Sequence, residues 1–178
     1  MLDNLIGKAK SQMSGIEEFF AGLPGIKGYK DKEQRREADK TVRTLLARQL
    51  DDQKKRLNGL QAELIEAGQL DMVDDIERSA MKLQTLSDRI RTASYGYAPL
   101  FDDVRVTEAE LDALAKFDEA MVEKVKEIAT AIDGMSELVS TPDADWKTSL
   151  RALNNLISQL NTEFGHRSEA ILQSAPEE

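Results

Sequence analysis

Residues 146–164 read Trp-Lys-Thr-Ser-Leu-Arg-Ala-Leu-Asn-Asn-Leu-Ile-Ser-Gln-Leu-Asn-Thr-Glu-Phe. The large apolar side chains of this stretch recur at alternating steps of four and three residues, at Trp146, Leu150, Leu153, Ile157, Leu160 and Phe164. This spacing is typical of an α-helix that buries one stripe of its surface. Because the spacing averages 3.5 residues per turn, it favours helices that wrap around one another with a left-handed twist.

Three earlier segments carry the same pattern, and only one polar residue, Gln53, interrupts their stripes. The stripes consist of Leu46, Leu50, Gln53, Leu57, Leu60 and Leu64, then of Val73, Ile76, Ala80, Leu83, Leu86 and Ile90, and then of Leu111, Leu114, Phe117, Met121, Val125, Ile128, Ile132 and Met135. We therefore predict helices over about 31–67, 71–94 and 107–140 before the one that contains residues 146–164.

Residues that start and stop helices flank these segments. Asp31 is suited to cap the first helix, and Gly68 supplies its C-terminal stop. Thr107 and Glu110 form a capping box at the start of the third helix, and Pro142 suits the first position of the fourth. The links at 68–70 and 140–142 are short. The two helices that each link joins must therefore pack side by side in opposite directions.

These elements predict an all-α protein, an elongated antiparallel four-helix bundle with left-handed coiled-coil packing over residues 31–173. A further amphipathic helix is predicted over residues 1–23. A Pro/Gly hinge at 24–30 would join that helix to the bundle, and a disordered acidic tail would occupy 174–178.

Composition removes many kinds of catalytic site. The 178 residues include no cysteine and one histidine, which excludes disulfides and thiolate metal sites and leaves little for histidine chemistry. Di-metal helical bundles use two Glu-x-x-His motifs, and only Glu163 with His166 matches here. We expect no enzyme activity, no cofactor and no metal. An enzyme or ferritin-like metal carrier that uses the bundle interior is the alternative.

Charge is distributed unevenly along the chain. The net charge is -9, but residues 1–60 carry +4 and residues 61–178 carry -13. This acidic balance argues against a nucleic-acid partner. The start of the chain is interrupted by Asp3, Asn4 and Gly7, so no secretory signal is expected, and no segment is apolar enough to span a bilayer. We predict a cytoplasmic protein that is peripheral to the inner face of the cell membrane if it contacts lipid.

Two segments carry apolar or basic residues beyond the four stripes. The first holds the candidate membrane or partner contacts Leu2, Leu5, Ile6, Met13, Ile16, Phe19, Phe20, Lys27, Lys30, Arg35 and Arg36. The apolar ones suit insertion between lipid headgroups, docking on a protein, or packing back onto the bundle. The second segment is a loop with Tyr95, Tyr97 and Phe101, which either plugs one end of the bundle or binds a partner.

Two stretches carry a resemblance. They are Pro24-Gly-Ile-Lys-Gly-Tyr-Lys-Asp-Lys-Glu-Gln-Arg-Arg-Glu-Ala-Asp-Lys40 and Asp88-Arg-Ile-Arg-Thr-Ala-Ser-Tyr-Gly-Tyr-Ala-Pro-Leu-Phe-Asp102. They resemble a family of bacterial helical proteins without an established activity. The resemblance implies a link to membrane-stress proteins of the flotillin/SPFH and phage-shock kinds, and the plan of an N-terminal helix before a helical hairpin is similar to the phage-shock protein A group.

The predicted function is a non-enzymatic helical scaffold or adaptor that acts through protein–protein contacts. Its partner would be another protein or a second copy of the chain, with an anionic membrane surface as a further candidate.

Overall fold

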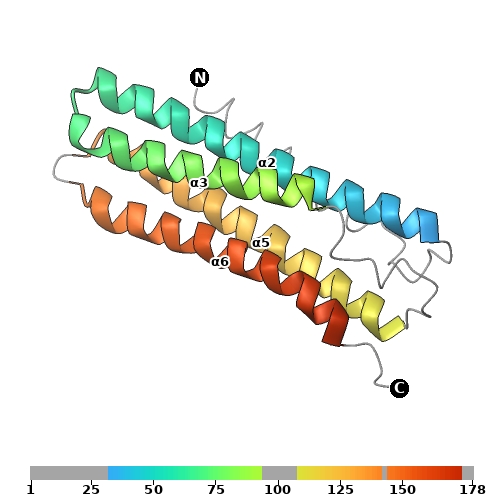
Figure 1. Ribbon diagram of the computed structural model, residues 1–178. Helices are drawn as coiled ribbons and strands as arrows, with labels where there is room; N and C mark the ends of the chain where they lie inside the picture. The colour runs from blue at the N-terminus through green and yellow to red at the C-terminus, as the bar shows by residue number, and fades with distance from the viewer. Residues whose placement is uncertain (1–31, 94–107, 142–143, 174–178) are drawn as a thin grey trace.

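The structure, a computed structural model, describes residues 32–93, 108–141 and 144–173 (Figure 1). Within these ranges the elements are α2 (Lys32–Glu66), the short 3₁₀ helix η2 (Leu70–Met72), α3 (Val73–Thr92), α5 (Glu108–Leu138) and α6 (Trp146–Gln173), and there is no strand. The prediction of an all-α fold built by helix packing is confirmed. The helix predicted over 1–23, the hinge at 24–30 and the tail at 174–178 lie outside the described residues.

Gly68 ends the turn after α2, as the sequence predicts. Its N–H donates to the carbonyl of Ile65 at 3.1 Å, and the N–H of Gln69 donates to the carbonyl of Leu64 at 2.9 Å. Gly68 has a φ of 74°, a left-handed conformation that strains residues with a Cβ atom. This Schellman turn satisfies the last carbonyls of α2 and allows α3 to return along it.

The start of α6 differs from the prediction. The helix begins at Trp146, so the placement of Pro142 at its first position is wrong. Asp145 caps the helix instead, because its Oδ1 accepts a hydrogen bond from the N–H of Thr148 at 3.0 Å. A carboxylate at this end also interacts favourably with the helix dipole.

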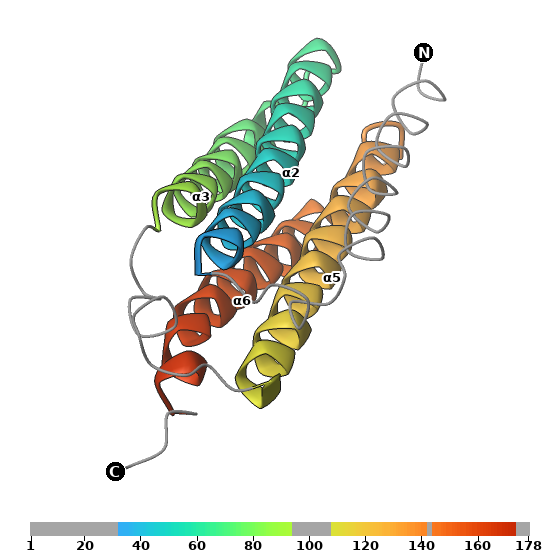
Figure 2. The same ribbon diagram turned by 90° about the vertical axis from the view of Figure 1, so that its right-hand side faces the viewer.

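Hydrogen bonds between α2 and α3 show that these helices are antiparallel. The Ser87 hydroxyl lies 3.0 Å from the carbonyl of Ala47, and Lys54 Nζ lies 2.6 Å from Gln84 Oε1, so residue numbers fall along α3 as they rise along α2. Helices α5 and α6 also run antiparallel and in contact (Figures 1 and 2). The two short links therefore join antiparallel neighbours, as predicted.

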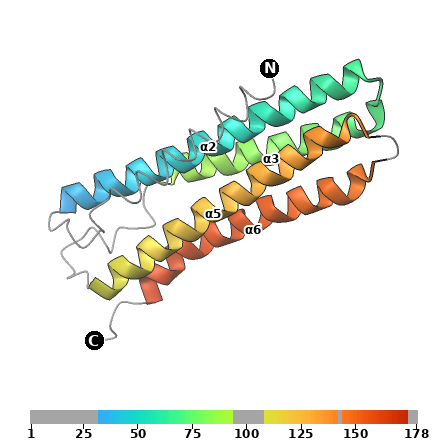
Figure 3. The ribbon, with the colours of Figure 1, turned by 180° about the vertical axis from the view of Figure 1, so that it is seen from behind.

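Contacts between the two hairpins join parallel helices. Arg56 of α2 donates to the carbonyl of Ala129 of α5 at 3.4 Å. Gln69, which follows α2, donates to the carbonyl of Val139, which follows α5, at 3.2 Å, so the residue numbers of the two partners rise together. Figure 3 shows α2 and α5 running in the same direction, and α3 contacts α6 in the same way (Figure 1). The predicted antiparallel bundle would instead place α5 beside α3, so the prediction of antiparallel neighbours is wrong for the contacts between the hairpins. The long link between Thr92 and Glu108 permits the observed arrangement, because it is long enough to cross one end of the structure.

Asn154 and Arg89 set the register of α3 against α6. Asn154 Nδ2 donates to the Ser79 hydroxyl at 3.1 Å, and Asn154 Oδ1 accepts from Lys82 Nζ at 2.8 Å. Two turns further on, Arg89 donates to the carbonyl of Asn161 at 3.1 Å, and its guanidinium carbon lies 5.6 Å from the ring centroid of Phe164. These polar contacts are directional, so they restrict sliding that apolar packing alone tolerates.

One apolar core runs between the helices and contains the predicted stripes wherever their side chains are described, whereas those of Leu111 and Leu114 lie outside the described part. Its buried stripe residues are Leu46, Leu50, Leu57, Leu60, Leu64, Ile76, Ala80, Leu83, Leu86, Ile90, Met121, Val125, Ile128, Ile132, Met135, Trp146, Leu150, Leu153, Ile157, Leu160 and Phe164. Val73 and Phe117 are partly buried against it. The 35 residues of α2 make a helix about 52 Å long at 1.5 Å per residue, so the core is elongated.

Gln53 is buried in this core at 2% exposure, although it is polar. Its Oε1 accepts a hydrogen bond from Arg56 at 2.7 Å. The Arg56 guanidinium also pairs with Asp133 of α5, and burial lowers the pKa of Arg56. The interruption of the first stripe therefore supplies a polar bridge from α2 to α5.

The central position of Ile157 makes it a direct test of the core. Ile157→Asp should cost several kcal/mol, because it buries a charge without a partner in a protein whose total stability is about 5–15 kcal/mol. Thermal melting followed by circular dichroism should show a large loss of stability. Gln159→Asp, at an exposed position two residues away, is the control and should melt close to the wild type. An unchanged melting temperature for Ile157→Asp would show that this face is not core.

Asp145 predicts a pH dependence of stability. Hydrogen bonding from the side chain and N–H of Thr148 lowers the pKa of Asp145 in the folded protein. Its contribution is therefore complete above the unfolded pKa of about 3.9 and is lost as the pH falls through the folded value. Asp145→Ala should lower the melting temperature at pH 7, and its difference from the wild type should shrink as the pH falls below about 4. Asp145→Asn keeps a capping oxygen that does not titrate, so its advantage over Asp145→Ala should persist at low pH. A wild-type advantage that does not depend on pH would contradict this assignment.

Candidate docking groove

The side chains predicted as partner contacts are mostly outside the described residues. This applies to the contacts within 1–30 and to Tyr95, Tyr97 and Phe101. Arg35 and Arg36 lie within the first turns of α2. These contacts therefore stay predictions, and the surface features below come from other residues.

A polar cluster joins α2 to α3 near the end of α3. The Ser87 hydroxyl, whose residue is fully buried, lies 2.6 Å from Asp51 Oδ1. Arg91 pairs with the other oxygen of Asp51 and also with Asp88, while Arg43 lies 3.4 Å from the carbonyl of Arg91. These hydrogen bonds and ion pairs hold α2 against α3 near the end of α3. The distance between the two helices is therefore determined by contacts within the chain.

Further along the hairpin, α2 and α3 border an open groove of about 560 Å³. Its lining residues are Lys54, Asn58 and Gln61 from α2 and Glu77, Ala80, Met81, Gln84 and Thr85 from α3. On α2 they lie three or four residues apart, and on α3 they form the pairs 80/81 and 84/85 that follow Glu77 at steps of three or four residues, so each set shares one face. Ala80 is buried, and its small side chain leaves space between the larger residues on either side.

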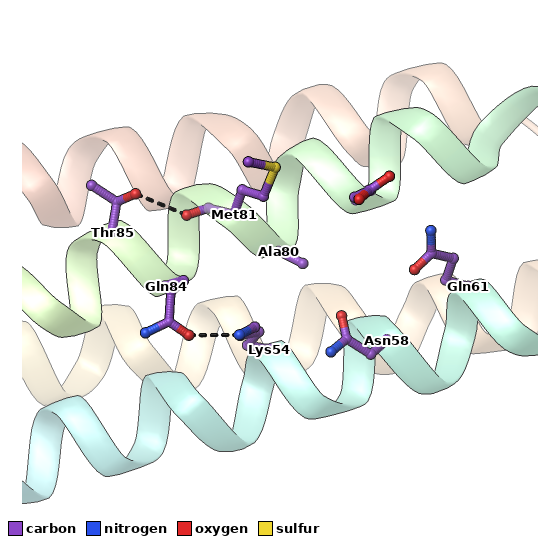
Figure 4. A pocket seen from close by; sticks show the side chains of 8 residues that line it. Lys54, Asn58, Gln61, Ala80, Met81, Gln84 and Thr85 are labelled. Carbon is purple, nitrogen blue, oxygen red and sulfur yellow. Dashed lines mark hydrogen bonds between the residues drawn. The ribbon is translucent and has the colours of Figure 1, made fainter.

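Amide groups dominate the polar lining of the groove. Gln84 is held in place, because its Oε1 accepts from Lys54 at 2.6 Å and its Nε2 donates to Asp88 at 2.8 Å. Asn58 and Gln61 make no side-chain hydrogen bond within the part of the chain that the structure describes. Figure 4 shows these two amides on α2 and Met81 on α3, with the Met81 side chain drawn on the side of α3 that points away from α2. Each amide offers both a donor and an acceptor to a partner.

Met81 is the apolar residue of this surface. It is 62% exposed, whereas its stripe neighbours Ala80 and Leu83 are buried. Ile65 and Leu70 are also exposed, but they do not line the groove. An exposed methionine costs free energy in water, and its flexible thioether adapts to different partner surfaces. The exposure of Met81 could be predicted from the sequence, because Met81 is a large apolar residue that lies outside the apolar stripe of its helix.

The motif considered for a metal lies on α6. Glu163 is half-buried, and its Oε2 has no hydrogen-bond partner among the described residues, whereas His166 is exposed. Within residues 32–93, 108–141 and 144–173, no group of three or more His, Cys, Asp or Glu side chains is placed to hold a metal ion. In those same ranges, none of the helices combines the length and hydropathy that a membrane span requires.

Comparison of the chain with protein-family models, with curated proteins and with solved structures finds no match.

Proposed function

We propose that this protein is a non-enzymatic helical scaffold or adaptor that binds other protein chains through the groove between α2 and α3. In this proposal the described helices form an elongated four-helix bundle with coiled-coil packing, extended by an amphipathic helix over residues 1–23. The observation that carries the proposal is Met81, exposed beside a groove with two amides that lack partners within the described residues.

The dimensions of the groove suit a partner helix. Lys54 and Gln61 are seven residues apart, which corresponds to about 10 Å, or two helical turns. A helix laid along the groove would place side chains from successive turns between α2 and α3, as in helix-in-groove recognition. Met81 would supply the apolar anchor, and the Asn58 and Gln61 amides would bond polar groups at its edge.

The core contributes the rigidity that such a surface needs. The floor residue Ala80 belongs to the buried cluster, and Gln84 is fixed by two hydrogen bonds. A partner would therefore meet side chains that lose little freedom on binding. The proposed contact of residues 1–23 with an anionic membrane at the inner face of the cell remains a prediction from the sequence.

Photocrosslinking in cells tests the proposed docking function. A photoreactive amino acid at Asn58 or Thr85, both exposed at the groove, should give discrete protein adducts. The same group at Gln159, exposed on α6, is the matched control and should give few. Adducts that are absent at the groove, or equally frequent at Gln159, would contradict the proposed function.

A further inference from the structure

We propose that the groove between α2 and α3 is the contact surface of a two-fold symmetric homodimer in which Met81 packs against Met81 of a second copy. This inference rests on the proposed function, because it uses the same groove, and it names a second copy of this chain as the partner.

The charged residues of the groove lie at its two ends. Glu77 marks one end on α3, and Lys54 marks the other, where its Nζ contacts Gln84. Glu77 and Gln84 are seven residues apart, about 10 Å along the helix. Ala80 and Met81 lie at the midpoint between them.

Neither charge is neutralised by the rest of the described chain. Within residues 32–93, 108–141 and 144–173, Lys54 bonds only the amide oxygen of Gln84, and Glu77 makes no hydrogen bond or ion pair. Some other charges of the hairpin have partners, such as Arg78 with Asp75. Within these ranges the groove therefore presents a negative charge and a positive charge that have no ion-pair partner. Glu77 lies four residues before Met81, and Gln84, which Lys54 contacts, lies three residues after it.

A two-fold axis through Met81 brings these opposite charges together. If the axis lies across the groove, the second copy runs antiparallel, and its Glu77 lies over the end that carries Gln84 and Lys54. The symmetry forms the same pair a second time at the other end, as in an isologous interface. A two-fold axis parallel to the helices would instead give a parallel dimer. In that dimer Glu77 of each copy would face the Gln61 amide and Lys54 would face the Gln84 amide of the other copy. Charge complementarity therefore favours the antiparallel dimer.

The expected interface is modest in area. The groove alone is smaller than the surface that stable complexes bury, about 1,200–2,000 Å² in total. Antiparallel packing extends the contact along α3, whose 20 residues span about 30 Å. We therefore expect a dimer that dissociates on dilution.

Sedimentation velocity of the full chain tests this dimer. Between about 1 and 100 μM, where modest interfaces dissociate, the wild type should change from monomer to dimer. Met81→Glu should weaken dimerisation at least tenfold. Ile65→Glu is the matched control, because Ile65 is similarly exposed at 52% but lies outside the groove, and it should dimerise like the wild type.

A charge exchange tests the symmetry itself. Lys54→Glu alone should weaken dimerisation, because it places two glutamates opposite each other at both ends. The double variant Lys54→Glu/Glu77→Lys should restore it, with circular dichroism showing that all variants are folded. A wild type that stays monomeric, a Met81→Glu variant that still dimerises, or a double variant without restoration would each overturn the dimer.

The proposed function would survive a monomeric wild type if crosslinking at the groove still captured a different protein, and it would fail only if the groove gave no adducts.

Discussion

The burial of four apolar stripes in one shared core is the constraint on which the rest of this structure depends. Each helix has a single large apolar face, and no helix can remove that face from water alone. Once the stripes meet, the rotation of every helix about its own axis is determined. Met81 is therefore exposed as a consequence of the burial of Ala80 and Leu83. The groove lies on the outer surface of α2 and α3, and the opposite faces of these helices form part of the core.

Polar contacts then select one arrangement among those that the core allows. Apolar burial is not directional, so stripes of similar spacing can pair in several ways. Arg56 reaches from α2 to α5, and Asn154 joins α6 to two residues of α3. These contacts favour parallel pairs between the hairpins. The Asp51, Ser87 and Arg91 cluster holds α2 against α3, so the hairpin that carries the groove is also well fastened.

The sequence predicted the elements that depend on local patterns. The stripes and the stop at Gly68 depend on spacing and backbone preference, and the structure bears both out. The sequence does not predict the start of α6 correctly, because Pro142 and Asp145 are both residues that commonly begin a helix. The packing of the whole chain selects Asp145 as the cap. The pairing of hairpins and the groove required long-range information. The residues that join the hairpins, such as Asn154, are polar and have no periodic signal in the sequence.

In the proposed function, the α2–α3 face binds a partner while the core behind it stays fixed. Methionine-methyl NMR observes both regions in one experiment, because Met81 is exposed at the groove whereas Met121 and Met135 are buried in the core. As the concentration of the protein rises, the Met81 methyl signal should shift or broaden, and the Met121 and Met135 signals should stay in place. A Met81 signal that is unchanged by concentration and by addition of cell extract would contradict this account.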